Sequence, residues 1–370
     1  MPNGFVPSDF PHGVGRTACL CLLAAVERAV DCTSRFTAGP RRHRGLLWLS
    51  YPAARILDSK GLQRFVWPLE YLAANWVGVA FVLFWCLLVG DVVTLGGNLF
   101  PQATTSIRSG AVVTAMCLCA IALVQGFRPP TLTDYEIALP GLPRELDGKV
   151  LVQLSDLHLG NILGKQWLQK LIARVNAMSP DIVVITGDLV DGNVGRVEPL
   201  RETLKQLRAP LGVWAVSGNH EFYAGLARSI ALFENAGFTA LRDASKQAAR
   251  GLNIAGVDDL TSRAPFTDAD HPINHALANR ASGATILLSH SPLDAEKAAA
   301  AGVGLMLSGH THNGQIWPFK YLVRSRYRLL SGRYDVNGLT AIVSRGTGTW
   351  GPRMRLWVPG EIVRIKLRSK

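Results

Sequence analysis

The sequence predicts an α/β domain that follows a pair of apolar segments long enough to cross a membrane. From Lys149 onward, short β-rich apolar runs alternate with segments whose apolar residues recur at helical spacing, which is the pattern of sheets covered by helices. Before that domain, apolar residues concentrate around residues 72–127. The 370-residue chain therefore has a mean hydropathy of +0.17, which is high for a soluble protein and indicates membrane segments.

Residues 1–65 form a basic N-terminal region whose structure the sequence does not reveal. Gly and Pro are scattered through it, and three arginines lie within residues 41–44. The apolar run Ala18–Val26 is too short to span a membrane. A signal peptide is the alternative interpretation because Arg16 precedes that run, but the run begins late and Glu27 ends it.

Two apolar segments within residues 66–128 predict a transmembrane helical hairpin. The first, about residues 71–90, is interrupted by a strongly polar side chain only at Asn75 and approaches the roughly 20 residues that a spanning helix needs. The second, about residues 108–126, is shorter and richer in Ala. A buried or interfacial helix is the alternative for this second segment.

Flanking charge predicts how the hairpin is oriented. Nine Lys and Arg residues precede the first span, the loop between the spans carries only Arg108, and Arg128 follows the second span. Because basic residues accumulate on the cytoplasmic side, we expect a multi-pass protein of the cell inner membrane, with the domain that follows the hairpin in the cytoplasm. Membrane proximity also explains the net charge of +12. Nucleic-acid binding is the alternative, but no basic stretch is interleaved with aromatic residues, so we expect no nucleic-acid partner.

Cysteine usage fits a reducing compartment, because the domain that follows the hairpin has no cysteine with which to form a disulfide. The six cysteines are Cys19, Cys21, Cys32, Cys86, Cys117 and Cys119.

Residues 129–147, with four prolines, predict an extended linker to a domain over residues 148–370. In that domain we expect strands at Val150–Leu154, Ile182–Ile185, Val213–Val216, Thr285–Leu288 and Gly304–Leu307. We expect helices at Lys165–Met178, Val197–Leu207 and Leu293–Ala301.

Five short clusters place metal-ligating residue types directly after these strands, where α/β sheets bind ligands. The clusters are Asp156-Leu157-His158, Gly187-Asp188, Gly218-Asn219-His220-Glu221, His290 and Gly309-His310-Thr311-His312. Carboxylate, amide oxygen and imidazole together suit hard and borderline divalent cations. A solvated loop or a buried core histidine explains any one cluster, but five clusters in order predict a two-metal hydrolytic centre.

Local geometry supports this interpretation at two of the clusters. In an extended strand tip, Asp156 and His158 point to the same side and can hold one ion. Asp188 follows a buried strand directly and can reach into the cleft to bridge two metals, and Gly187 allows the backbone to turn tightly there.

The ordered motifs DLHLG, GDLVDG, SGNHE, LSHSP and SGHTHNGQ resemble the calcineurin-like metallophosphoesterase superfamily over about residues 148–368. Within it, the chain looks most like the membrane-associated bacterial branch of YkuE-like phosphoesterases and UDP-2,3-diacylglucosamine pyrophosphatases. The tail Ser344–Gly348 also resembles this branch. Pro359-Gly360-Glu361 departs from it, because the branch usually has Pro-Glu there, and we expect only a small local change.

The resemblance implies a four-layer α/β/β/α sandwich and two divalent metal ions, with manganese, iron and zinc all compatible. It places Asp156, His158, Asp188 and His312 on the first metal. It places Asp188, Asn219, His290 and His310 on the second metal, so that Asp188 bridges the two. A metal-bridging hydroxide would then attack phosphorus in line. His220 would be the catalytic acid or would stabilise the developing charge.

Further residues have implied supporting roles. Glu221 and Asp191 are candidates for orienting imidazole ligands, and an exposed loop acid is the alternative for Asp191. Arg345 and Arg353 are candidates for binding substrate phosphate, and a structural salt bridge is the alternative for both. The pair Asp258-Asp259 follows an apolar run, and we expect a supporting or structural role for it.

The leading hypothesis is a phosphoesterase at the cytoplasmic membrane face that hydrolyses a phosphate ester or pyrophosphate. Its substrate would be lipid-linked, for example UDP-2,3-diacylglucosamine, because the hairpin confines the site to the bilayer surface. A phosphodiesterase or nuclease with a soluble substrate is one alternative. A non-catalytic membrane scaffold is another, and the complete ligand set argues against it.

Overall fold

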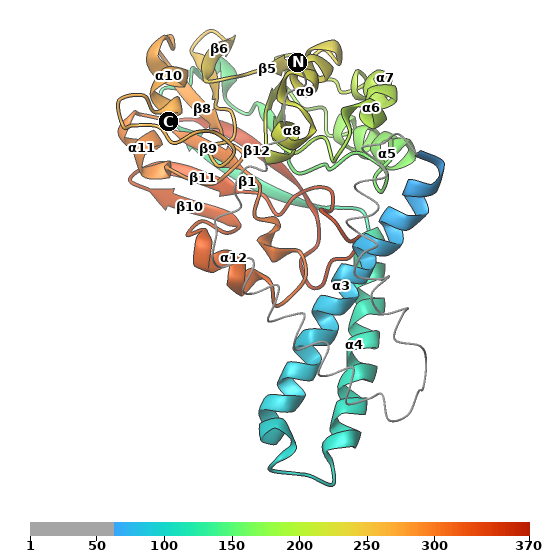
Figure 1. The fold of residues 1–370 in the computed structure, drawn as a ribbon. Coiled ribbons are helices and arrows are strands. Elements are labelled where there is room, and N and C mark those ends of the chain that lie inside the picture. The colour runs from blue at the N-terminus through green and yellow to red at the C-terminus, as the bar shows by residue number, and fades with distance from the viewer. Residues whose placement is uncertain (1–62) are drawn as a thin grey trace, which may run out of the picture.

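The structure is a computed structural model that describes residues 63–370. The signal-peptide alternative and the three cysteines before residue 33 lie outside the described residues, as does almost all of the region 1–65. In the described part, a helical hairpin projects from one edge of an α/β domain (Figure 1).

The domain contains two six-stranded sheets. The first has the order β1 (Thr131–Leu139), β12 (Glu361–Ser369), β2 (Val150–Leu154), β3 (Ile182–Thr186), β4 (Val213–Val216) and β5 (Thr239–Ala240). The second has the order β10 (Gly332–Val336), β11 (Leu339–Val343), β9 (Leu305–Ser308), β8 (Ala284–Leu288), β7 (Leu252–Gly256) and β6 (Ala244–Ala249). The central strands β2, β3 and β4 are parallel, as are β7, β8 and β9.

Alternating side chains of the strands divide the core into layers. In β3, Val183 and Ile185 pack under helices, whereas Ile182 and Val184 face the second sheet. The helices over the first sheet are α5 (Lys165–Asn176), α6 (Val194–Val197), α7 (Arg201–Leu204), α8 (Asn219–Ala224) and α9 (Leu226–Asn235). The second sheet packs against α10 (Pro272–Ala278) and α11 (Ala295–Ala300) through a separate apolar cluster. The four-layer α/β/β/α prediction is confirmed, and burial on both faces explains the continuous apolar strands.

Two expected elements differ from the structure. Residues 129–147 are not a simple linker, because Thr131–Leu139 forms strand β1, which pairs in parallel with β12 along its whole length. The four prolines flank this edge strand and none lies inside it, so its backbone remains free to pair. The expected helix Val197–Leu207 is instead broken into α6, a 3₁₀ turn at Glu198–Leu200 and α7, and Pro199 lies in that turn.

The hairpin helices are longer than expected. Helix α3 covers Gln63–Thr94 and α4 covers Thr104–Phe127, with a 3₁₀ turn at Leu95–Gly97 after α3. By length and composition, both helices can cross a membrane. Toward the free end of the hairpin, Arg108 pairs with Asp91 at 2.9 Å, which offsets one charge on each of the two apolar helices.

The domain-proximal half of the hairpin packs against two loops of the α/β domain. Val82 and Ala122 are buried in one apolar cluster with Ile316 and Met354. Helix α4 approaches the second loop so closely that a Cβ atom on Gly126 would collide with the carbonyl oxygen of Arg353. The hairpin is therefore fixed to the domain by close backbone packing as well as by apolar contact.

This close approach gives a test of the docking. Gly126→Val should lower the free energy of unfolding of the detergent-solubilised protein by roughly 1–3 kcal/mol, because the added side chain must displace the Arg353 backbone. Thermal unfolding followed by circular dichroism measures the change. Gly110→Val is the matched control in the same helix, where a Cβ atom meets nothing within 4 Å. Equal melting temperatures for the two variants would contradict the docking.

Candidate metal centre

The five sequence clusters converge where the carboxyl ends of strands from both sheets meet. Asp156 and Asp188 follow β2 and β3, and Asn219 begins α8 just after β4. From the second sheet, His290 follows β8, and a pair of histidines follows β9. The site is therefore shared by the two sheets, and neither sheet holds it alone.

A buried glutamine joins the sheets at this edge. The Nε2 atom of Gln153 in β2 donates to Thr186 Oγ1 of β3 at 3.0 Å and to the Ser308 carbonyl of β9 at 2.9 Å. Because Gln153 is fully buried, these bonds fix the spacing between the strand ends from which the candidate ligands project.

Five of the candidate ligands have a left-handed backbone. The φ angles are 53° at Asp156, 45° at His158, 51° at Asp188, 69° at His310 and 48° at His312. Strained backbone of this kind concentrates at functional sites. The extended strand tip expected for Asp156 and His158 was wrong, because both residues turn out of the strand. Their side chains still face one point.

Gly187 is the position where a side chain is excluded. Its φ is 84°, and a Cβ atom would lie 2.5 Å from Nδ1 of His290 and 2.8 Å from the Cα atom of Gly218. The tight turn expected before Asp188 is present, and it lets the loops after β3, β4 and β8 touch.

The first group of ligand atoms comes from Asp156, His158 and His312. The two imidazole Nε2 atoms are 3.1 Å apart, and Nε2 of His312 is 3.3 Å from Asp156 Oδ1. Oδ2 of Asp188 lies 3.8 Å from Nε2 of His158 and so borders this group.

The second group comes from Asp188, His290 and His310. Nε2 of His290 is 3.2 Å from Asp188 Oδ2 and 3.1 Å from His310 Nδ1. The amide oxygen of Asn219 lies 3.0 Å from His310 Nδ1 and 3.1 Å from His290 Nε2. Oδ2 of Asp188 is therefore within reach of both groups.

Comparison with known proteins agrees with this geometry. The model of the family described as calcineurin-like phosphoesterase matches residues 149–314. A protein of Danio rerio described as a transmembrane protein with metallophosphoesterase domain is 33% identical over 326 residues, which cover 81% of this chain and 74% of that protein. The chain belongs to the calcineurin-like phosphoesterase family.

Bacterial relatives are of similar distance. An uncharacterized metallophosphoesterase of Campylobacter jejuni is 30% identical over 317 residues, covering 81% of this chain and 84% of the relative. Another, from Aquifex aeolicus, is 35% identical over 248 residues, covering 64% of this chain and 91% of the relative. The metallophosphoesterase is thus a metal-dependent hydrolase of phosphoric esters, and its family uses two divalent metal ions.

The donor set of this metallophosphoesterase fits two such ions. Ligand atoms held about 2.1 Å from one ion lie roughly 3.0–3.4 Å apart, and the separations of 3.0–3.3 Å within the two groups fall in this range. The converging imidazole nitrogens, amide oxygen and carboxylate oxygens can all donate an electron pair to a cation, so one ion in each group satisfies several of them at once. The mixture of oxygen and nitrogen donors leaves manganese, iron and zinc open.

Two histidines are oriented by partners that the sequence did not indicate. Nδ1 of His290 lies 2.8 Å from the Thr186 carbonyl oxygen, so this nitrogen donates and Nε2 is left as the ligand atom. Nε2 of His310 lies 2.7 Å from the hydroxyl of Tyr327. Tyr327 stands outside every motif, and no spacing in the sequence could have identified it.

Charge inside the site favours cation binding. Burial would lower the pKa of His290, but the Asp188 carboxylate outweighs it and holds that pKa well above its usual value. Burial and the neighbouring His220 lower the pKa of His158 to about 3. Burial and the neighbouring His290 lower the pKa of His310 to about 4. His158 and His310 are therefore neutral, as a metal ligand must be. His290 carries a proton at the position where a metal ion would bind, so the ion would replace that proton.

His220 lies beside the ligand groups, and its Nδ1 is 3.2 Å from Asp191 Oδ1. Burial would lower its pKa, but Asp188 and Asp191 outweigh burial and raise it to about 9. Its backbone N–H donates to Asp188 Oδ1 at 2.9 Å. The position of Asp191 fits the expected imidazole-orienting role better than that of an exposed loop acid.

Glu221 has a different role from the one expected, because its carboxylate contacts the backbone and does not orient an imidazole. Its oxygens accept the N–H groups of Asp188 at 2.9 Å, Val190 at 2.9 Å and Gly218 at 2.7 Å. Burial, and then the charge of Asp188, raise the pKa of Glu221 to about 7. This carboxylate fixes the loop after β3 to the loop after β4.

The two candidate substrate arginines also differ from the expectation. Arg345 is paired with the buried carboxylate of Glu361, with Nη2 at 2.7 Å and Nε at 3.0 Å from Oε2, so the structural salt bridge is the better description. Arg353 donates from Nη1 to the Ile162 carbonyl at 3.1 Å and lies over the ring of Phe127, at the end of the hairpin. Neither arginine contacts the two ligand groups in these interactions.

Asp258 and Asp259 support the site from outside. Asp258 accepts from the Ser217 hydroxyl at 2.7 Å, and Asp259 accepts from the Ser291 hydroxyl at 2.6 Å. Each serine adjoins the loop of a candidate ligand, which agrees with the supporting role expected for the pair.

Metal binding should release a proton, because the pKa of His290 is raised and its imidazole is charged at neutral pH in the metal-free protein. Titration calorimetry with Mn²⁺ at pH 7, in buffers of different ionisation enthalpy, should give about one proton released on filling the second group. Affinity should fall about tenfold for each pH unit lowered.

The matched variant is His290→Asn, which keeps a neutral donor and should abolish most of the proton release. Heats that do not depend on the buffer in the native protein would contradict this account of the site.

The backbone-holding role of Glu221 predicts a large stability effect. Glu221→Gln should lower the free energy of unfolding by about 2–4 kcal/mol, because an amide nitrogen replaces one of the acceptors for three buried N–H groups. Urea unfolding of the metal-free protein measures the change. Glu202→Gln is the control, since that exposed carboxylate makes only surface ion pairs and should cost less than about 1 kcal/mol. Similar losses for the two variants would refute the assignment.

Proposed function

We propose that this metallophosphoesterase hydrolyses a phosphate ester or pyrophosphate in a lipid-linked substrate at the cytoplasmic face of the inner membrane. UDP-2,3-diacylglucosamine is a substrate of this chemical type. The observation that carries the proposal is the position of the two ligand groups relative to the hairpin. Both groups include or border Asp188 Oδ2. The loops beside them are the loops on which the membrane-length hairpin packs.

The proposed ligands follow from the two groups of atoms. Asp156, His158 and His312 would hold the first ion, and Asp188 would complete its set. Asn219, His290 and His310 would hold the second ion, with Asp188 as the ligand common to both sets. When bound, the ions supply an activated water molecule and clamp the phosphate oxygens.

His220 supplies the proton for the leaving group. Its Nδ1 donates to Asp191, which leaves Nε2 as the atom that can deliver a proton to the leaving oxygen. In the metal-free protein, Asp188 and Asp191 raise the pKa of His220 to about 9 against the effect of burial, so the imidazole holds a proton at neutral pH. The bond from its backbone N–H to Asp188 keeps it at a fixed distance from the ligand groups.

Exposed aromatic and apolar side chains around the hairpin support a site at the bilayer surface. Helix α12 (Lys320–Arg326) leaves Tyr321 and Leu322 each 61% exposed, and Trp357 is 55% exposed next to Trp317. Basic residues also lie on α12, which is the combination found where proteins meet anionic membrane surfaces. In Figure 1, α12 lies on the side of the domain from which the hairpin projects.

An aromatic wall beside His220 supports a substrate with a flat or apolar part. The rings of Tyr223 and Trp350 have centroids 5.6 Å and 6.5 Å from that of His220, and both residues are exposed, Tyr223 more than Trp350. A nucleobase or an acyl chain next to the scissile phosphate can pack against such rings.

The test is hydrolysis by the purified full-length protein in detergent with Mn²⁺, comparing UDP-2,3-diacylglucosamine with bis(p-nitrophenyl) phosphate. Asp188→Ala should abolish turnover because both ions lose a ligand. His220→Gln should lower kcat by about 10²–10⁴-fold with little change in KM, because only proton delivery is lost. Asp335→Ala, which removes an exposed carboxylate on β10, is the control and should retain full activity.

The substrates separate the parts of the proposal. Preferred turnover of the lipid-linked nucleotide supports it as stated. Turnover of the soluble diester alone refutes the lipid part and favours a phosphodiesterase with a soluble substrate. Equal activity of the native protein and Asp188→Ala refutes the metal centre.

A further inference from the structure

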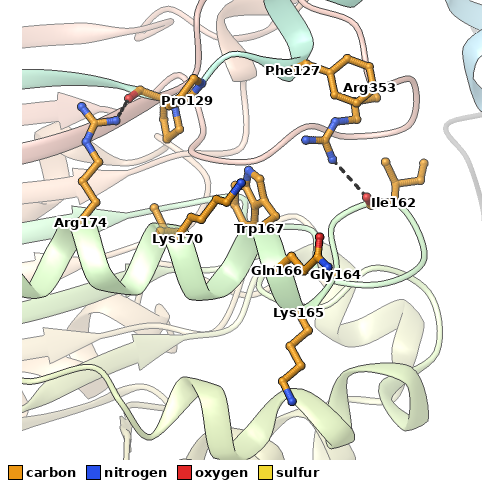
Figure 2. Close-up of a pocket in the computed structure, with 12 residues that line it drawn as sticks. Phe127, Pro129, Ile162, Gly164, Lys165, Gln166, Trp167, Lys170, Arg174 and Arg353 are labelled. Carbon is orange, nitrogen blue, oxygen red and sulfur yellow. Dashed lines mark hydrogen bonds between the residues drawn. The ribbon is translucent and has the colours of Figure 1, made fainter.

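A basic cavity lies apart from the metal centre, at the end of α4 that joins the α/β domain. Its volume is about 590 Å³, and none of the candidate metal ligands lines it. Its walls come from the end of α4 and the two prolines that follow, the start of α5, and the loop that carries Arg353 (Figure 2).

The lining is strongly positive. Lys165, Lys170, Arg174 and Arg353 belong to it, and no carboxylate does. In Figure 2, the side chains of Lys170, Arg174 and Arg353 lie around the space beside Trp167, whereas Lys165 points away from it. Several cations that surround one cavity repel each other, so an anion placed among them would be stabilised by all of them.

The charges of this cavity are not balanced by the described part of the protein. Arg353 donates to the carbonyl oxygen of Ile162 and lies 4.6 Å from the ring centroid of Phe127. Arg174 donates to the carbonyl oxygen of Pro130. These partners are neutral, and among the described residues neither arginine is paired with a carboxylate. The contacts hold the guanidinium groups in place while leaving their charge uncompensated.

Helix α5 adds to the positive potential. It has 12 residues, begins beside the cavity at Lys165, and carries no acidic residue in its first turn. Gly164 precedes it and has no side chain to cap the free N–H groups. The partial positive charge of the helix start therefore acts in the same direction as the basic side chains.

The position of the cavity along the hairpin indicates which anion could bind in it. Phe127 is both the last residue of α4 and part of the lining, and Pro129 and Pro130, which follow after Arg128, also line the cavity. If α4 crosses the bilayer as proposed above, its end lies at the level of the lipid headgroups, where cytoplasmic leaflets carry anionic phosphate esters. Trp167, which also lines the cavity, is of the residue type that favours this interfacial level.

We propose that this cavity binds the phosphate group of an anionic phospholipid, next to the membrane end of α4. The bound headgroup would hold the domain against the bilayer on the side of α5. The loop from His158 to Gly164 connects the first ligand group directly to this cavity, so a lipid bound there fixes the far end of that loop. The inference rests on the membrane placement of the hairpin and not on hydrolysis.

The test is lipid binding by the full-length protein in detergent, measured by titration calorimetry. The probes are dihexanoyl phosphatidylglycerol, dihexanoyl phosphatidylcholine and inorganic phosphate. We expect the native protein to prefer phosphatidylglycerol. Lys170→Ala should weaken that binding about fivefold, the effect of one basic residue near an anionic surface. Lys170 is exposed, so its loss should leave the fold intact.

The control is Lys246→Ala, which removes the same charge from β6 of the second sheet and should leave lipid affinity unchanged. Equal effects of the two variants, or equal binding of the two lipids, would overturn the proposal. Inorganic phosphate that binds as tightly as phosphatidylglycerol would overturn the lipid source and leave a site for free phosphate. Lipid binding is measured without hydrolysis, so loss of the lipid-binding proposal and loss of the proposed enzyme activity can be distinguished.

Discussion

The structure around the metal centre depends on one constraint: several carboxylates are buried close together, and their mutual repulsion must be compensated by neighbouring groups. Asp156 and Asp188 are almost completely buried, and burial of a charge is unfavourable unless it is paired. Each carboxylate is therefore met by imidazole and by backbone N–H groups: His310 N–H donates to Asp156, and His220 N–H donates to Asp188. Glu221 adds a third buried acid, and its three amide donors place it behind Asp188, where it holds the loops instead of binding an ion.

The sequence was sufficient for the parts of the fold that repeat a simple pattern. Strands such as β3 and β8 are buried on both faces, so their continuous apolar residues stand out, and the polar residues that follow each strand mark the site. Strand β1 was missed because it lies at the edge, is only partly buried, and is flanked by prolines that suggested a linker. Pro199 divided a helix whose apolar spacing looked continuous.

Side-chain roles were harder to predict where they depend on partners distant in sequence. Arg345 could have faced either a substrate or an acid, and only the folded chain brings Glu361 against it. The residue types and order of the candidate ligands were evident, but their left-handed backbone was not. Positive φ is uncommon for any residue other than Gly, even though Asp and His adopt it more often than most. That geometry is imposed by the close approach of loops from the two sheets.

Hydrogen bonds also connect the hairpin to the metal centre, which explains why apolar helices and a hydrolytic site occur together in one rigid unit. The backbone N–H of Arg355 donates to the Ala122 carbonyl of α4 at 2.9 Å. The buried guanidinium of Arg355 then donates to the carbonyl oxygens of Gly346 and Gly348, and the Gly348 N–H donates to the Asp156 carbonyl at 3.0 Å. Each step is a direct hydrogen bond between buried groups, so Arg355 and Gly348 connect the backbone of α4 to the backbone of Asp156. The hairpin and the first ligand group therefore belong to one continuous set of hydrogen bonds.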